Sequence, residues 1–388
     1  MVFPEGGIFS LYHENAPFVM TSMQAAVSRE IIEKILAAGA RAPSGSNSQP
    51  WQFEVVGNRI AVIGLPERDH PVLNFRNRGT WLAHGALLEN IAIAARANGY
   101  EADLDLFPDA SRPHVTAVIT LSPLAGQSGL EPLYQAIFER CTNRKPYFGA
   151  ISETVRRQLL AVVAGDANGK QGGDNGGAKV FFVEDPSAIG AIANASAVNE
   201  SVMFANRKLH ALMFREIVWS ESEEQRRGGG LYFPTMELSA PRAAVKMLGS
   251  WSVMRAANRF GAAVKIAETD ARTYAATPLM AAIAVGGDGD ASYLAAGRLM
   301  ERLWLQATAF GLSAHPLTGV LFMAQRIAAR DDVIFAPRER TEIEAAYQAI
   351  TAAAGSGTAT IVAVLRIGNG GEPTARSIKL PAQVRFEG

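Results

Sequence analysis

Two helical segments of the same pattern stand far apart in this chain. GALLENIAIAARANG begins at Gly85 and GRLMERLWLQATAFG begins at Gly297, and the two align without gaps. Both are apolar on most faces, and each closes on a glycine, Gly99 or Gly311, that suits a left-handed helix C-cap. We expect two equivalent buried helices that pack against each other at the centre of the molecule.

A second pair of segments extends the repeat. SREIIEKILAAGAR from Ser28 resembles SETVRRQLLAVVAG from Ser152, and each serine is placed as a helix N-cap. Runs of β-branched residues follow the helices: FEVV, RIAVIG and VTAVITL in one half, KVFFVED and TIVAVLRIG in the other. The pattern predicts a duplicated α+β chain in which each half reads helix, strand, helix, strand.

The spacing of the repeats predicts the domain organisation. We expect an N-terminal extension at residues 1–20, a first half at 21–135 and a second half at 136–388. The second half is longer because it carries an insertion at about 193–277, rich in aromatic and charged residues, which we interpret as a lid.

Composition excludes several classes of partner and site. Lys plus Arg and Asp plus Glu balance at 37 each, so no net basic field draws the chain to nucleic acid or to an anionic membrane surface. The single cysteine, Cys141, excludes an internal disulfide or a multi-thiolate metal site, and we expect it to pack and not to react. No stretch reads as a clean membrane span or a signal peptide. We expect a soluble, cytoplasmic protein without a metal.

Four segments contain residues suited to ligand binding. They are ARAPSGSNSQPWQFEVV from Ala40, RCTNRK from Arg140, HPLTG from His315 and RIGNGGEPTARSIK from Arg366. The guanidinium groups of the second and fourth suit a phosphate, since forked, charge-assisted hydrogen bonds match its oxygens. Taken singly, each segment is equally consistent with an ordinary turn or a solvated charge run.

Together the four segments resemble the nitroreductase family. APSxxNxQPW before a strand is typical of that family and stands here at Ala42 to Trp51. RCTNR resembles its N-terminal phosphate motif, the glycine-closed helices its dimer helix, HPLTG its flavin-edge turn, and the PTARS tail its C-terminal phosphate segment. The long single-chain, tandem branch is the most similar. The resemblance implies a nitroreductase-like fold of two pseudo-symmetric halves, each an antiparallel-type sheet flanked by helices.

The resemblance also implies one composite FMN site per chain. The first half has APSGSN but no arginine motif, whereas the second has the other motifs but only GDANGK where APSxxN belongs. The implied cofactor-binding residues are Pro43, Ser44, Gly45, Asn47, Arg140, Thr142, Asn143, Arg144, Pro316, Leu317, Thr318, Gly319, Arg376, Ser377 and Lys379. The family often has an acidic residue where Thr318 stands, which bears on how a nicotinamide is handled.

The implied reaction passes electrons from NADH or NADPH through FMN to a nitro compound, a quinone or another small acceptor. We expect Trp219, Tyr232 and Phe233 of the lid, and His315, to contact the substrate, and no residue is a certain catalytic group. The chain is expected as an internal pseudo-dimer, monomeric or further dimerised. Two alternatives stay open, namely an FMN-storing protein without turnover and a flavin-cleaving or dehalogenating enzyme.

Overall fold

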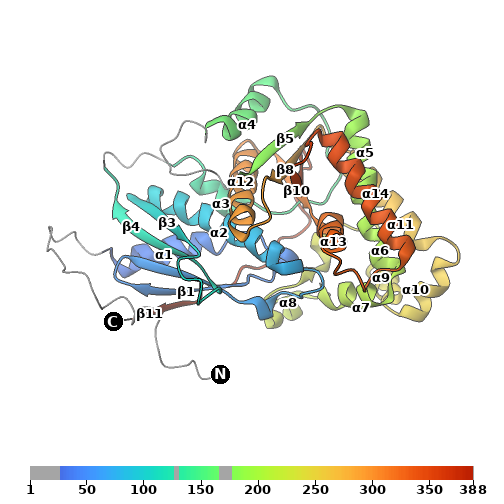
Figure 1. Cartoon of the computed structure of the whole chain (residues 1–388), viewed down its shortest axis with the longest axis horizontal. Helices are drawn as coiled ribbons and strands as arrows, with labels where there is room; N and C mark the ends of the chain where they lie inside the picture. Colours follow the sequence, from blue (N-terminus) through green and yellow to red (C-terminus); the bar gives the residue numbers. More distant parts are fainter. Residues whose placement is uncertain (1–26, 126–130, 166–176, 388) are drawn as a thin grey trace.

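The computed structural model describes residues 27–125, 131–165 and 177–387. The expected N-terminal extension and most of the glycine-rich loop that contains GDANGK lie outside these ranges. Within them the chain forms an α+β structure with two main sheets (Figure 1).

The two sheets share one strand order. The first runs β11-β1-β2-β4-β3 and the second β5-β8-β10-β9, so β1-β2-β4-β3 corresponds strand for strand to β5-β8-β10-β9. Within these two sheets, the neighbouring strands are antiparallel except for β1 and β11. Strand β11, the C-terminal strand of the second half, adds in parallel to the sheet of the first half, with Phe53 opposite Val384. The strands are β1 (Trp51–Val56), β2 (Arg59–Gly64), β3 (Tyr100–Leu106), β4 (Val115–Pro123), β5 (Lys179–Val183), β8 (Leu279–Val285), β9 (Ser313–Leu317), β10 (Thr360–Gly368) and β11 (Val384–Phe386).

The two long helices end next to the predicted glycines but begin at Arg78 and Asp290, seven residues before Gly85 and Gly297. Ser28 caps the first helix by accepting a hydrogen bond from the Ile31 amide, and Gly99 and Gly311 both adopt positive φ after the long helices. The helices that belong to the two halves are α1 (Arg29–Gly39), α2 (Arg78–Ala97), α3 (Tyr134–Glu139), α4 (Glu153–Gly165), α12 (Asp290–Ala309), α13 (Gly319–Ala328) and α14 (Pro337–Ala354), with short 3-10 turns η2 (Gly45–Asn47), η3 (Pro66–Arg68) and η4 (Phe75–Asn77).

Helices α2 and α12 pack against each other between the two sheets (Figure 1). They meet at the repeat-equivalent glycines, because a Cβ added at Gly85 would lie 2.1 Å from the Leu294 carbonyl oxygen and 2.9 Å from the Gly297 Cα. A Cβ at Gly297 would in turn lie 2.1 Å from the carbonyl oxygen of Leu82. The two backbones therefore touch, and no residue other than glycine fits at either position.

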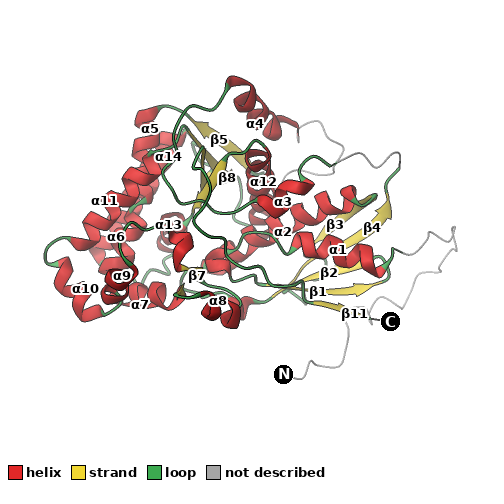
Figure 2. Cartoon of the chain, turned by 180° about the vertical axis from the view of Figure 1, so that it is seen from behind, coloured by secondary structure: helices red, strands yellow, loops and turns green. Residues whose placement is uncertain are grey.

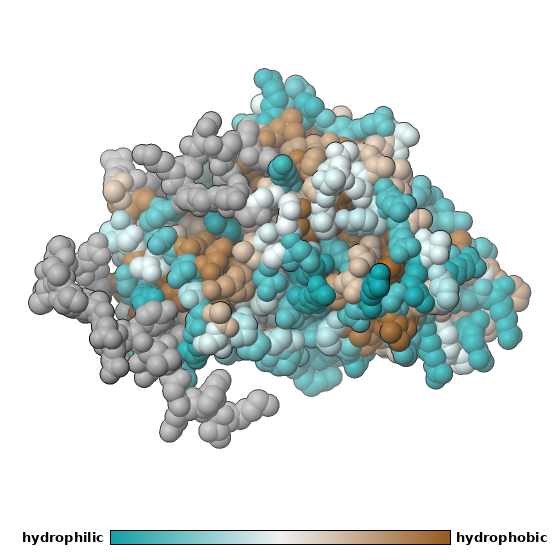
Figure 3. All heavy atoms as spheres, in the orientation of Figure 1, coloured by the Kyte–Doolittle hydropathy of each residue, from teal (hydrophilic) through white to brown (hydrophobic). Residues whose placement is uncertain are grey.

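The segment between β5 and β8 is mostly helical. It is longer than the insertion predicted at about 193–277, because it begins with α5 directly after β5. Most of its helices form one end of the molecule, whereas residues 221–232 extend to the loop before the five-stranded sheet, where the Gly230 amide donates to the Ser46 carbonyl oxygen (Figures 1 and 2). Its elements are α5 (Pro186–Ser196), α6 (Val198–Ala205), α7 (Arg207–Glu216), β6 (Ile217–Val218), α8 (Glu221–Arg227), β7 (Leu231–Tyr232), η5 (Phe233–Met236), α9 (Arg242–Leu248), α10 (Trp251–Asn258) and α11 (Ala262–Ala275). Figure 3 shows apolar atoms interspersed with hydrophilic ones over this end.

One local expectation was wrong. HPLTG is not a turn, because His315 to Leu317 belong to the edge strand β9, where Pro316 does not interrupt the sheet, and Gly319 is the first residue of α13. The strand was not predicted because a proline followed by a glycine is typical of a turn.

No helix in the described ranges is long and apolar enough to cross a bilayer.

The glycine contact generates a stability prediction. Gly85→Ala or Gly297→Ala should lower the free energy of unfolding by about 1–3 kcal/mol or more, since the added methyl meets backbone that cannot move aside. Gly190→Ala is the matched control, because its position in α5 is open and alanine is the better helix former. Denaturant unfolding of the three variants checks this. Equal stability of Gly85→Ala and Gly190→Ala would show that the helices do not touch.

Candidate active site

The loop between α1 and β1 holds an unusual backbone. Ser46, Asn47 and Gln49 all have φ near +50°, a region that costs energy for residues other than glycine and that clusters at functional sites. The strain persists only because surrounding contacts hold it. This loop carries four of the predicted cofactor residues: Pro43, Ser44, Gly45 and Asn47.

Gln49, which the sequence reasoning did not single out, holds the loop in place. Its buried side chain donates to the carbonyl oxygens of Asn47 (3.3 Å) and Gly228 (3.2 Å) and accepts from the Leu380 amide (2.8 Å). It therefore joins the loop to the second half's insertion and tail. The glutamine of the QPW motif was the available signal for this role.

Four cationic side chains converge beside this loop, those of Arg41, Arg140, Arg376 and Lys379. Arg140, at the end of α3, is buried, donates to the Arg41 carbonyl oxygen (2.6 Å) and places its Nε 3.0 Å from the Glu301 carboxylate of α12. Lys379 of the tail donates to the carbonyl oxygen of Ala42 (2.7 Å) and to Asn47 Oδ1 (3.0 Å). Arg376 donates to the Glu139 carbonyl oxygen.

The cations perturb one another. Burial lowers the pKa of Arg41, and the charges of Arg140 and Arg376 lower it further. Burial also lowers the pKa of Lys379 well below its usual range, with Arg140 and Arg41 acting in the same direction and Glu301 opposing them. Since positive charge is crowded into a partly dry site, a bound anion would relieve the repulsion.

The rest of the arginine motif runs alongside β9. Thr142 forms a parallel bridge with Ala314, and the Asn143 amide donates to the Ala314 carbonyl oxygen (3.1 Å). The Asn143 side chain reaches Ser313 and Gly371, whereas Arg144 donates to the Thr235 carbonyl oxygen of the insertion (2.9 Å). The structure thus brings the arginine motif, the tail and β9 together.

The end of β9 leads into α13. Thr318 precedes the helix, and the Gly319 position is so crowded that an added Cβ would meet the side chain of Asn199 from α6. The start of α13 therefore packs against α6 of the insertion. Helix N-termini of this kind favour negative charge.

The insertion contacts the same loop and tail. The Gly230 amide donates to the Ser46 carbonyl oxygen (2.8 Å), and Glu237 accepts from both the amide and the hydroxyl of Thr374. Glu224 of α8 accepts from the Ile378 amide (3.1 Å) and is hydrogen-bonded to Ser377, so Ser377 faces the insertion.

The predicted substrate aromatics form a cluster of their own within the insertion. The rings of Trp219 and Phe233 stack with centroids 5.4 Å apart, Lys246 lies over Trp219 and Arg242 over Phe233. The carbonyl oxygen of Tyr232 accepts from the Thr235 hydroxyl. Each of the two stacked rings therefore also has a cation over it.

A buried polar network that the sequence did not reveal lies behind β9. His315 is buried beside Tyr274, with ring centroids 5.8 Å apart, and burial lowers its pKa well below the usual range, so the imidazole is neutral. Arg366, opposite His315 on β10, is fully buried and stacks on Tyr147 at 4.3 Å.

Two carboxyls complete this network. Tyr274 donates to Glu200 (3.2 Å), and burial together with the charge of Asp270 raises the pKa of Glu200 to about 7. Burial raises the pKa of Asp270 to about 6. No motif announces these residues, because they come from α6 and α11 and meet only in the fold.

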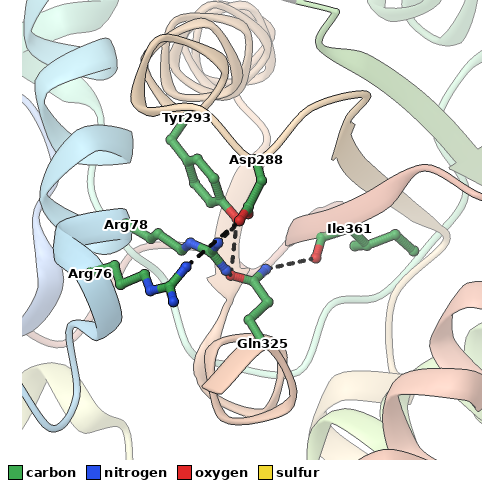
Figure 4. Close-up of polar contacts among 6 residues, drawn as sticks. All are labelled: Arg76, Arg78, Asp288, Tyr293, Gln325 and Ile361. Carbon is green, nitrogen blue, oxygen red and sulfur yellow. Dashed lines mark hydrogen bonds and ion pairs between the residues drawn. The ribbon is translucent and has the colours of Figure 1, made fainter. Parts of the chain in front are cut away.

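A separate polar cluster fastens the two halves at the start of the central helices. Buried Arg78 donates to Gln325 (2.8 Å) and pairs with Asp288, while Tyr293 donates to the same Gln325 oxygen (3.1 Å) (Figure 4). Its polar groups satisfy one another, and we assign it a structural role.

Comparison with known proteins agrees with this geometry. A family model described as the nitroreductase family matches residues 22–68, the stretch that contains the strained loop. Together with the motifs, this match supports membership of the nitroreductase family.

Two relatives come from Mycobacterium tuberculosis. An uncharacterised protein is 22% identical over 303 residues, 76% of this chain and 39% of that protein. A protein named "Putative NAD(P)H nitroreductase acg" is 26% identical over 190 residues, 48% of this chain and 54% of that protein. The chain thus spans between about a third and about half of the length of the curated relatives it matches.

Solved structures give weaker likenesses. The FMN- and NADPH-dependent nitroreductase NfnB of a Sphigopyxis strain is 14% identical, with 64% of this chain and 93% of that chain covered and a TM-score of 0.35. Iodotyrosine deiodinase bound to FMN and 3-iodo-L-tyrosine is 12% identical, with 66% and 99% covered and a TM-score of 0.36. At these TM-scores we draw no conclusion about function from the similarity.

The buried carboxyls generate a prediction about pH. Because Glu200 binds its proton more tightly in the folded chain than at the ordinary value of 4.5, its contribution to stability is complete at low pH. It is lost as the pH rises through about 7. Glu200→Gln should therefore gain stability relative to the wild type by about 1–3 kcal/mol near pH ~8.5 and much less near pH ~4.5.

Denaturant unfolding at both pH values measures the difference, with exposed Glu33→Gln as the control. A Glu200→Gln effect that does not change with pH would contradict the assignment.

Proposed function

We propose that the chain is an FMN-dependent oxidoreductase with one composite flavin site. It would pass electrons from NADH or NADPH to a nitro compound, a quinone or another small acceptor. The observation that carries the proposal is the meeting of the loop at 42–49, the arginine motif and the tail at one crowded cation cluster. These segments come from both halves, as a composite site requires.

The cluster fits a phosphate. The Arg41 Nε is buried and has no hydrogen-bond partner in the described part of the chain, and the Glu301 carboxylate lies within ion-pair distance of Arg140. Three guanidiniums and an ammonium around a single carboxylate leave excess positive charge. A dianionic phosphate would accept charge-assisted hydrogen bonds from these groups.

Residues of both halves would hold the cofactor. Arg140, Arg376 and Lys379 would bind the phosphate, with Thr142 beside them, and Pro43, Ser44, Gly45 and Asn47 would cover the cofactor from the first half. Asn143, Arg144, and Pro316 to Gly319 would line the ring. FMN supplies the hydride-transfer chemistry when bound.

The chain's own contribution is electrostatic and steric. The positive charge of Arg144 and the amides at the start of α13 would stabilise negative charge near the ring, as preorganised dipoles do. Neutral His315 lies in the strand before these amides and could donate or accept a hydrogen bond at Nδ1, which has no partner among the described residues. The insertion would exclude water and restrict the shape of the acceptor.

FMN storage is the second candidate. The contacts of the insertion with Ser46, Arg144 and Thr374 favour it, because they close the loop and the tail from one side. A closed site would retain the cofactor while denying access to a nicotinamide.

Reduction under argon separates the two candidates. The purified chain should show flavin absorbance that bleaches on addition of NADH or NADPH and returns with a quinone or nitro compound. Absorbance that neither nicotinamide changes would support storage. A chain that binds no FMN would contradict both candidates.

Arg376→Ala should weaken FMN binding by between about tenfold and about a hundredfold, since a charge-assisted hydrogen bond contributes about 1.5–3 kcal/mol. Arg376 is the better probe, because removing Arg140 would leave the buried Glu301 without its partner. Arg338→Ala, on the exposed face of α14, is the matched control. Fluorescence titration measures both affinities, and equal affinities would remove the tail from the site.

A further inference from the structure

Charge is distributed unevenly in the insertion although the whole chain is balanced. Residues 238–267 contain five basic residues and no acidic one: Arg242, Lys246, Arg255, Arg259 and Lys265. The stretch comprises α9, α10 and the start of α11. The stretch therefore has a local positive field, although the net charge of the whole chain is zero.

The same stretch exposes large apolar side chains. Leu238, Met247, Phe260 and Val264 are 40%, 60%, 83% and 50% exposed, and they are four of the seven large hydrophobic residues found exposed in the described ranges. Such clustering on a surface marks an interaction site, whereas scattered apolar residues need no explanation.

Basic and apolar groups alternate at the corner between α10 and α11. Arg255 is exposed on α10, and Arg259 and Phe260 are exposed directly after it. Val264 and Lys265 are exposed in the first turn of α11. An open apolar hollow lies beside Phe260, lined by Ser252, Val253, Ala256, Ala257 and Phe260.

Neighbouring elements add to the positive charge. Asn258 donates to the Phe204 carbonyl oxygen (2.9 Å), which places the start of α7, with exposed Arg207 and Lys208, next to this corner. The corner lies at the extremity of the molecule away from the first sheet (Figures 1 and 2).

We propose that this corner docks on an anionic lipid bilayer. Arg255, Arg259 and Lys265 would contact lipid phosphates while Phe260 and Val264 enter the boundary between headgroups and acyl chains. A bilayer matches both properties of the surface. A nucleic-acid backbone would match the charge alone and would leave Phe260 in water. The proposal concerns attachment to the surface of a membrane and does not depend on the proposed flavin chemistry.

Vesicle co-sedimentation of the full chain tests the proposal. The chain should sediment with vesicles of phosphatidylcholine mixed with phosphatidylglycerol, far less with phosphatidylcholine alone, and progressively less as salt is added. Phe260→Ser and the double variant Arg255→Glu, Arg259→Glu should each lower the bound fraction at least about fivefold, because each removes one of the two contributions.

Two controls match these variants in exposure and chemistry. Val333→Ser changes an apolar residue that is 90% exposed, and Arg338→Glu changes an arginine whose side chain is 87% exposed, both outside the insertion. Neither should alter binding, and circular dichroism should confirm that all variants fold.

Three results would overturn the proposal. The first is that the chain does not sediment with anionic vesicles. The second is that the control variants lose as much vesicle binding as the test variants. The third is that Phe260→Ser leaves vesicle binding unchanged, which would indicate attraction by charge alone. Tighter binding to duplex DNA than to anionic vesicles would assign the surface to nucleic acid instead.

Discussion

The backbone contact between Gly85 and Gly297 is the constraint on which the arrangement of the two halves depends. Because neither position tolerates a Cβ, α2 and α12 cross at van der Waals distance and hold the two sheets at a defined separation. Helix α12 also carries Glu301, so the same crossing places the carboxylate that pairs with Arg140. The β11 strand, donated to the sheet of the first half, secures the tail that brings Arg376 and Lys379 to the site.

The candidate site is assembled from strained and repelling parts. Three left-handed residues in the loop at 44–49 and the clustered cations around Arg140 both cost free energy, which the Gln49 contacts and the tail offset. Repulsion among the cations raises the free energy of the empty site. An anion that relieves this repulsion therefore binds more tightly. The insertion supplies partners to the loop, to Arg144 and to the tail, and it also carries the basic, apolar corner at its outer end.

Sequence reasoning reached the fold through its repeats. The glycine-closed helices and the serine caps could be predicted from the sequence, because helix termini and close helix–helix contacts require particular residues at particular positions. Strand β9 was missed because Pro316 and Gly319 resemble a turn, and β11 because three residues carry little pattern. The loop, the arginine motif and the tail could be assigned to one site only through resemblance. The Glu200, Asp270 and Tyr274 network could not be predicted at all, since its members share neither a motif nor a periodic face and meet through tertiary packing.

In the proposed function the two halves together build a single flavin site. The ratio of FMN to chain at saturation, measured by titration of flavin-free protein with absorbance and fluorescence readouts, tests it most directly. The account predicts one FMN per chain, because only one set of loop, arginine motif and tail is complete. Two FMN molecules per chain, or one per two chains, would contradict it.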